Sequence, residues 1–204
     1  MMLASTAGYG EAAADLVEQY ESVSFADVHR DVLHLFPTHP SAILDIGAGS
    51  GRDAAALVAL GHRVVAAEPT AELRSLGRWT HAGTDIEWVD DALPELAVLR
   101  DHGGHFDLIL LTAVWMHLDE RQRARSMGTV AGLLAPEGCV VLSLRHGPVP
   151  AGRRMFDVTA HETVELAREH GLTATHLSAR QDPHGRQGVS WSYVGLRREP
   201  SATS

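Results

Sequence analysis

An apolar strand that runs into three alternating glycines and then into a helix constrains the fold of this chain more than any other feature. The strand is Ala42-Ile43-Leu44-Asp45-Ile46, the turn is Gly47-Ala48-Gly49-Ser50-Gly51, and a helix follows from Arg52-Asp53 to about Leu60. Glycine permits positive φ and lets a ligand lie against the backbone where a Cβ would collide. The first turn of the helix presents unpaired N–H groups to that ligand. The segment therefore predicts a nucleotide-binding turn in an α/β fold.

The spacing of the glycines argues against a pyrophosphate ligand. A dinucleotide fold requires G-x-G-x-x-G, but the position of the third glycine is occupied here by Arg52. With Asp45 on the preceding strand, the segment resembles motif I of the class I AdoMet-dependent methyltransferases, in which the glycine turn underlies the methionine part of the cofactor. The charge of Asp45 lies inside an apolar strand and needs partners, which either the amides of the turn or the ammonium group of the ligand would supply.

Three later segments resemble the same family in the same order. The strand 63–67 ends at Glu68, about twenty residues beyond the glycines, where a carboxylate can accept hydrogen bonds from two ribose hydroxyls. The strand 86–89 runs into Asp90-Asp91-Ala92-Leu93-Pro94, which resembles the Asp-Ala segment beside adenine, and we favour Asp91 over Asp90 as the acceptor for the adenine amine. The strand 106–112 and the segment 113–118 are similar to motif IV, which faces the sulfonium.

The resemblance implies S-adenosyl-L-methionine as the cofactor and a set of residues around it. Taken singly, each of the carboxylates is better interpreted as a solvated strand end or a helix N-cap, but their order and spacing together favour the cofactor. The expected cofactor contacts are Asp45, Gly47, Ala48, Gly49, Ser50, Gly51, Arg52, Asp53, Glu68, Pro69, Asp90, Asp91, Ala92, Leu93, Thr112, Ala113 and His117.

The alternation of strands and helices predicts an α/β, Rossmann-like, seven-stranded and mostly parallel sheet with helices on both faces. We expect a single domain over 1–204, with a helical cover at 1–40, a cofactor-binding core at 41–145 and a substrate-side segment with a β-hairpin at 146–204. The cover consists of helices near 10–20 and 26–36, and the hairpin strands lie at 173–178 and 190–196. An antiparallel C-terminal strand is typical of this methyltransferase fold. Pro136-Glu137-Gly138 predicts the end of a long helix, and Thr159 with Glu162 predicts a capping box.

Composition limits the classes of partner and the compartment. The formal charge is −9, and no basic run interleaved with aromatic residues occurs, so nucleic acid is a poor candidate and a small-molecule or peptide acceptor fits better. Neither a signal peptide nor an apolar run of about twenty residues is present, so we expect no membrane association and a cytoplasmic location. The single cysteine, Cys139, suits a reducing compartment. Among the 13 histidines no metal-binding spacing occurs, and the sequence is compatible with a homodimer.

Two histidines are candidates for a general base. A sulfonium methyl group is already activated, so a base is needed only if the acceptor starts protonated. His117 is the first candidate because imidazole titrates near neutral pH and its segment faces the methyl group in the resembling family. His146, just beyond the fifth strand, is the second. The structural alternative is that His117 binds the backbone or stacks beside the cofactor.

Aromatic and cationic residues outside the cofactor motifs predict the acceptor site. They are Tyr20, Phe25, Trp115, Arg145, Arg153 and Arg154. The arginine pair favours an anionic or zwitterionic acceptor, since guanidinium binds carboxylate and phosphate bidentately, whereas a solvated basic loop is the alternative. The function predicted is methyl transfer to such a molecule. The rival interpretation is an AdoMet-binding protein that transfers no methyl group, either an enzyme that cyclises or eliminates the cofactor or a regulatory binding module.

Overall fold

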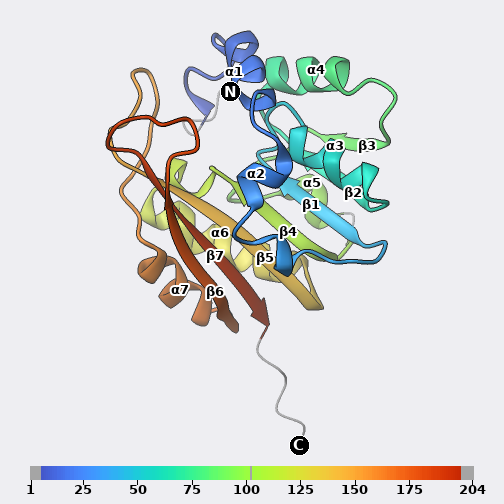
Figure 1. Cartoon of the computed structure of the whole chain (residues 1–204). Coiled ribbons are helices and arrows are strands. Elements are labelled where there is room, and N and C mark those ends of the chain that lie inside the picture. Colours follow the sequence, from blue (N-terminus) through green and yellow to red (C-terminus); the bar gives the residue numbers. More distant parts are fainter. Residues whose placement is uncertain (1–5, 102, 199–204) are drawn as a thin grey trace, which may run out of the picture.

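A seven-stranded sheet forms the frame of the molecule (Figure 1), whose computed structural model describes residues 6–101 and 103–198. The strand order is β3-β2-β1-β4-β5-β7-β6, with β1 to β5 paired in parallel and β7 antiparallel to both β5 and β6. This arrangement confirms the predicted mostly parallel sheet with an antiparallel C-terminal strand. The strands are β1 (Ala42–Ile46), β2 (Arg63–Ala67), β3 (Ile86–Val89), β4 (Phe106–Thr112), β5 (Leu134–His146), β6 (Leu172–Gln181) and β7 (Ser190–Arg198).

Helices cover both faces of the sheet because the central strands are apolar on both sides. Successive strand residues point to opposite faces, so Ile43 packs with Leu57 on one side while Leu44 packs with Val130 on the other. The helices are α1 (Ala13–Glu21), α2 (Phe25–His29), α3 (Arg52–Ala59), α4 (Ala71–Thr80), α5 (Ala97–Asp101), α6 (Glu120–Leu133) and α7 (Ala160–Arg168), with 3₁₀ turns η2 (Leu33–Leu35) and η3 (Trp115–His117).

The segment 26–36 differs from the single helix that its periodicity predicts. It contains the short α2 and then the 3₁₀ turn η2. The ring of Phe25 packs against that of Phe36 with centroids 5.5 Å apart. In a continuous helix these two residues would be about 16 Å apart along the axis, at about 1.5 Å per residue. The aromatic contact therefore requires the chain to bend back on itself.

Two further boundaries are shifted relative to the sequence prediction. Helix α6 ends at Leu133 and β5 begins directly at Leu134, so 136–138 lies within β5 and not at a helix end. The register between β4 and β5 slips there, and this irregularity accommodates a proline that has no N–H to donate. The Thr159 side chain accepts from the Glu162 N–H as expected, but the Glu162 carboxylate pairs with Arg123, so the capping box is half formed.

The carboxyl ends of the parallel strands meet at one edge of the sheet, and the N-terminal part of the chain lies over that edge. Helix α1 lies beside α4 there (Figure 1). Among the described residues, none of the helices has the length and apolarity that crossing a membrane would require.

Candidate active site

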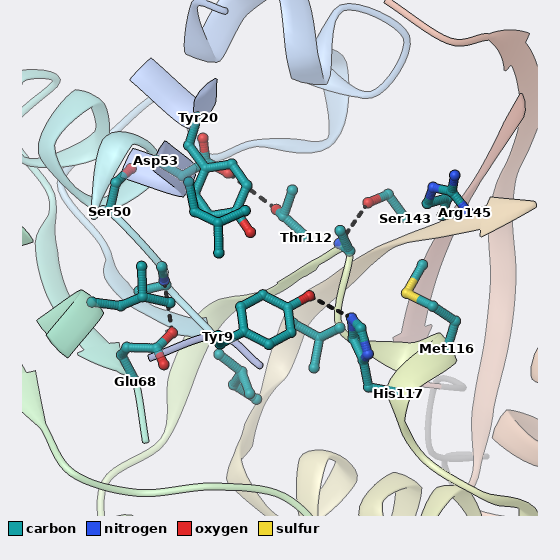
Figure 2. A pocket seen from close by; sticks show the side chains of 18 of the residues that line it. Tyr9, Tyr20, Ser50, Asp53, Glu68, Thr112, Met116, His117, Ser143 and Arg145 are labelled. Carbon is teal, nitrogen blue, oxygen red and sulfur yellow. Dashed lines mark hydrogen bonds between the residues drawn. The ribbon is translucent and has the colours of Figure 1, made fainter. Parts of the chain in front are cut away.

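A cavity of about 540 Å³ lies between the N-terminal segment and the carboxyl edge of the sheet. It brings together residues from the glycine turn, the ends of the strands and the N-terminal segment, and Figure 2 draws 18 of the lining residues and labels ten of them. The predicted site residues that line it are Tyr20, Asp45, Gly47, Ala48, Gly49, Ser50, Arg52, Asp53, Glu68, Pro69, Asp91, Ala92, Leu93, Thr112, Ala113, His117, Arg145 and Arg153.

Two glycines of the turn are required by close packing as well as by conformation. Gly47 has φ +69°, and a Cβ there would lie 2.5 Å from Cγ2 of Val114. Gly49 has φ +58°, and a Cβ there would lie 3.2 Å from the ring of Tyr20. Any other residue would therefore push against the walls of the cavity in addition to adopting a strained backbone. The turn is the floor of the cavity, and Tyr20 lies over it.

Asp45 presents a buried carboxylate oxygen that no other described residue satisfies. The residue is 2% exposed, and its Oδ2 has no hydrogen-bond partner among the residues that the structure describes. Burial and the neighbouring carboxylate of Asp53 raise the pKa of Asp45 well above its usual value. The turn amides bond elsewhere: those of Gly47 and Ala48 donate to the Ala67 carbonyl, and that of Gly49 donates to Glu68. A ligand that offers a cationic or N–H donor could therefore satisfy this oxygen.

Glu68 is held rigidly at the end of β2 by two backbone amides. Its carboxylate accepts from the Gly49 N–H at 2.9 Å and from the Thr70 N–H at 2.8 Å, and burial raises its pKa. Each carboxylate oxygen still has a lone pair for another donor. Glu68 therefore presents two acceptor oxygens in a fixed position.

The two adjacent carboxylates after β3 have different environments. Asp91 lines the cavity, and its oxygens accept from the Ala92 and Leu99 amides at 2.9 and 3.0 Å. Asp90 lies outside the cavity lining, where its exposed side chain pairs with Arg74 at 2.9 Å. The arrangement agrees with the preference for Asp91 and corrects the inclusion of Asp90, because successive residues at a strand end point in opposite directions.

Asp53 ties α3 to the neighbouring elements. It accepts from His29 Nε2 and Arg52 Nε at 2.8 Å each and from Thr112 Oγ1 at 3.0 Å. Burial alone would raise its pKa, but His29 and Arg52 beside it hold that pKa well below the usual value. Arg52 also donates from Nη1 to the Tyr20 carbonyl at 3.0 Å. The N-terminal cover is thereby fastened to the glycine turn.

His117 and Tyr9 form a hydrogen-bonded pair at the opposite side of the cavity (Figure 2). His117 Nδ1 lies 2.8 Å from the Arg154 carbonyl, and Nε2 lies 2.9 Å from the Tyr9 hydroxyl. Because a carbonyl only accepts, Nδ1 carries the hydrogen, and the hydroxyl donates to Nε2. Burial lowers the pKa of His117, as do the nearby charges of Arg153 and Arg145, although its bond to the Arg154 carbonyl acts in the opposite direction. The ring is therefore neutral at neutral pH.

Arginines form the wall beside this pair. The guanidinium of Arg153 lies 3.9 Å from the centre of the Tyr9 ring. Arg145 donates from Nη1 to the Pro148 carbonyl, while its buried Nε has no partner among the described residues. Arg186 binds Asp182, which also accepts from the indole N–H of Trp191. Within the described part of the chain neither Arg145 nor Arg153 forms an ion pair, so both line the cavity as cations without a directly paired carboxylate.

Three predicted acceptor residues lie outside the cavity lining, which corrects their assignment. Phe25 packs against the rings of His29 and Phe36 within the cover. Trp115 is fully buried in the core under β4, where the 3₁₀ turn directs it inward. Arg154 pairs with Asp119 at 3.0 Å and lies over the Phe156 ring, because consecutive residues of this extended segment point to opposite sides and Arg153 takes the inner one.

Two further predicted residues are also displaced from the cavity. His146 shares a 2.9 Å hydrogen bond with Ser192 on β7, since it follows Arg145 on β5 and points to the other face. Gly51 has φ +85° as the N-cap of α3, and a Cβ there would meet the ring of Trp88. Gly51 starts the helix and is not among the residues that line the cavity.

Sequence reasoning missed several residues that line the cavity. Ser143 accepts a hydrogen bond from the Ala113 N–H, and it could have been found because it alternates with Arg145 on a predicted strand. Trp191 lines the cavity from β7. Tyr9 lies in the segment Gly8-Tyr9-Gly10, where no periodicity or motif marks it.

Comparison with known proteins gives one family and one fold. A family model described as a methyltransferase domain matches residues 43–138. A 1,6-didemethyltoxoflavin N1-methyltransferase from Burkholderia thailandensis, solved with that compound and S-adenosylhomocysteine, is 24% identical over 93% of this chain and 90% of its own, with a TM-score of 0.63. A TehB-like SAM-dependent methyltransferase from Corynebacterium glutamicum is 20% identical over 93% and 99%, with a TM-score of 0.65. The glycopeptide N-methyltransferase MtfA with bound AdoMet is 16% identical over 85% and 93%, with a TM-score of 0.66. The search of curated proteins finds no match.

Proposed function

We propose that this chain, which a methyltransferase-domain family model matches over residues 43–138 and which has the fold of solved SAM-dependent methyltransferases, is a class I AdoMet-dependent methyltransferase that methylates a small anionic or zwitterionic molecule held by Arg145 and Arg153. The observation that carries the proposal is that both arginines line the same cavity as the glycine turn. An acceptor bound there shares one enclosed space with the cofactor.

The residues of the acidic half of the cavity fit AdoMet. The unpartnered Oδ2 of Asp45 would accept from the ammonium group, and the fixed carboxylate of Glu68 would accept from the ribose hydroxyls. Asp91 would accept from the adenine amine, with Leu93 packing on the ring. When bound, the cofactor supplies an electrophilic methyl carbon. The task of the protein is then to align a lone pair with that carbon and exclude water, where positioning can contribute roughly 7–11 kcal/mol of the barrier.

The arginine wall accounts for the class of acceptor. The chain carries a formal charge of −9, so an anion is repelled by the protein as a whole and needs a local cationic site. Arg145 and Arg153 provide such a site because neither forms an ion pair with a carboxylate of the described residues. A guanidinium binds a carboxylate or phosphate through two parallel hydrogen bonds, which gives direction as well as affinity.

The test combines a search for the acceptor with charge reversal at the wall. Methyl-labelled AdoMet would be incubated with the protein and a panel of small carboxylates and phosphates that carry hydroxyl, amine or thiol groups. We expect S-adenosylhomocysteine to form only when a competent acceptor is added. Release of methylthioadenosine from AdoMet alone would instead support the rival function, in which another bond of the sulfonium reacts.

Charge reversal distinguishes a binding arginine from a surface arginine. Arg153→Glu should raise the KM for the acceptor at least tenfold and leave AdoMet affinity nearly unchanged, because the two ligands use different walls. Arg154→Glu is the matched neighbour outside the cavity lining, and Arg197→Gln is a neutral surface control. A wild-type KM in Arg153→Glu, or a best acceptor that carries no charge, would refute the anionic acceptor site.

A further inference from the structure

We propose that Tyr9 and His117 form a proton relay in which the Tyr9 phenol receives the proton of the acceptor and passes its own proton to His117. The inference rests on the proposed function, since a relay is useful only if the acceptor reacts at a protonated atom. It assigns a chemical role to Tyr9, and it changes the predicted role of His117 from a base in direct contact with the acceptor to a base behind a phenol.

The hydrogen bonds determine the direction of the relay. His117 is 6% exposed, and both of its ring nitrogens are already engaged. The Arg154 carbonyl fixes the hydrogen on Nδ1, which leaves Nε2 as the basic nitrogen, and Nε2 accepts from the Tyr9 hydroxyl. A proton that leaves the acceptor therefore reaches Nε2 through the Tyr9 oxygen. Two rings 108 residues apart in sequence are brought edge to face, with centroids 5.5 Å apart, to make this contact.

The charges around the pair keep both groups in the required starting state. Arg153 and Arg145 act on both side chains, and Glu68 and Tyr20 also act on Tyr9. Burial raises the pKa of Tyr9, so the phenol begins protonated, although Arg153 partly offsets this effect. The lowered pKa of His117 keeps its ring neutral and able to accept a proton at neutral pH.

The proton transfers balance without any further reactant. The bond between the reacting atom of the acceptor and its hydrogen breaks, and its electron pair becomes the lone pair that forms the new bond to the methyl carbon. The proton goes to the Tyr9 oxygen, whose own proton moves to His117 Nε2. The imidazolium that results donates from Nε2 to Tyr9 and from Nδ1 to the Arg154 carbonyl, and it later loses a proton to water.

The first test uses the protein without any acceptor. Nitrogen-15 NMR of labelled histidines, with the His117 signals identified by their absence in His117→Gln, reports tautomer and pKa. We expect a neutral ring with hydrogen on Nδ1, and a higher His117 pKa in Tyr9→Phe because the phenol donor stabilises the neutral ring. Hydrogen on Nε2, or an unchanged pKa in Tyr9→Phe, would overturn the relay.

The second test uses a hydroxyl acceptor from the panel described above. Tyr9→Phe and His117→Gln should each lower kcat by about 10²–10⁴-fold and flatten the acidic limb of its pH profile. The double variant should be no slower than the slower single variant, because the two groups act as one unit. AdoMet affinity should stay near wild type, and His176→Gln, a histidine outside the cavity lining, should keep normal turnover.

The outcomes separate the relay from the function on which it rests. Turnover of an acceptor with wild-type kcat in Tyr9→Phe overturns the relay and leaves the methyl transfer standing. No turnover with any member of the panel overturns the proposed function, and the NMR titration still decides whether the two side chains share a proton in the way proposed.

Discussion

Replacing Asp45 by Asn should stabilise the free protein and weaken AdoMet binding, two opposite effects of one buried oxygen. The substitution keeps the shape of a side chain that is 2% exposed and removes its charge. In the free protein that charge has no partner at Oδ2 and lies near Asp53 and Glu68, so its loss relieves desolvation and repulsion. With AdoMet bound, the same charge would pair with an ammonium group.

The pH dependence gives the stability effect its magnitude. The ordinary pKa of an exposed Asp is 3.8, and burial together with the charge of Asp53 raises the pKa of folded Asp45 well above it. Between these two values the unfolded chain has lost the proton that the folded chain keeps, so stability falls by about 1.4 kcal/mol per pH unit as pH rises, until the folded pKa is reached. Asn carries no such cost. The stability advantage of Asp45→Asn over the wild type should therefore grow with pH and then level off. For a chain of this size, each kcal/mol of that advantage raises Tm by roughly 2–4 °C.

Thermal unfolding at several pH values and titration calorimetry with AdoMet would measure the two effects. A charge-assisted hydrogen bond contributes about 1.5–3 kcal/mol, so the dissociation constant for AdoMet should rise about 10- to 150-fold. Asp90→Asn is the matched control, since it removes an exposed carboxylate that directly follows β3 and lies outside the cavity lining. A Tm below that of the wild type for Asp45→Asn above neutral pH would contradict an unpaired buried charge in the free protein. Wild-type affinity for AdoMet in this variant would contradict its pairing with the ammonium group.

Two other substitutions test the remaining parts of the cofactor site. Glu68→Gln should weaken AdoMet binding at least tenfold, about 1.4 kcal/mol. Because burial raises the pKa of Glu68, we expect calorimetry to show that wild-type affinity falls as falling pH protonates this carboxylate, and that Glu68→Gln lacks this pH dependence. Gly49→Val should weaken binding by a similar factor while unfolding stays cooperative, because its Cβ would press on Tyr20. Gly61→Val is the control, because Gly61 also has a positive φ but a Cβ there would meet nothing within 4 Å. Equal losses of affinity in the two variants would assign the effect to backbone strain and not to the contact with Tyr20.

The sequence predicted the half of the site that lies on regular strands. Asp45 and Glu68 occupy strand ends whose position follows from period-two alternation and from a glycine turn of fixed geometry. The same alternation distinguishes neighbours: Arg145 lines the cavity while His146 faces Ser192. The hairpin that completes the sheet was also predictable, because both of its strands alternate and a loop rich in proline and glycine joins them.

The sequence could not predict contacts that depend on how irregular segments fold back. Tyr9 precedes the first helix, and its bond to His117 arises only when the N-terminal segment crosses the sheet edge. Trp115 was misjudged for the same reason, since a 3₁₀ turn and not a strand or a helix sets its direction. Ala113 adopts φ +58° beside the cavity, a conformation that no residue-type preference predicts for alanine.

Charge divides the cavity in a way that would orient the two ligands relative to each other. Carboxylates from β1, β2 and the segment after β3, namely Asp45, Glu68 and Asp91, line one half, and arginines from β5 and the segment after it line the other. AdoMet carries positive charge on its ammonium and sulfonium groups, so the acidic half favours it, whereas an anionic acceptor is favoured only beside Arg145 and Arg153. Each ligand would be repelled from the other's half. The Tyr9–His117 pair lies against the basic half, under the influence of both arginines, so the base is on the side where the acceptor would enter.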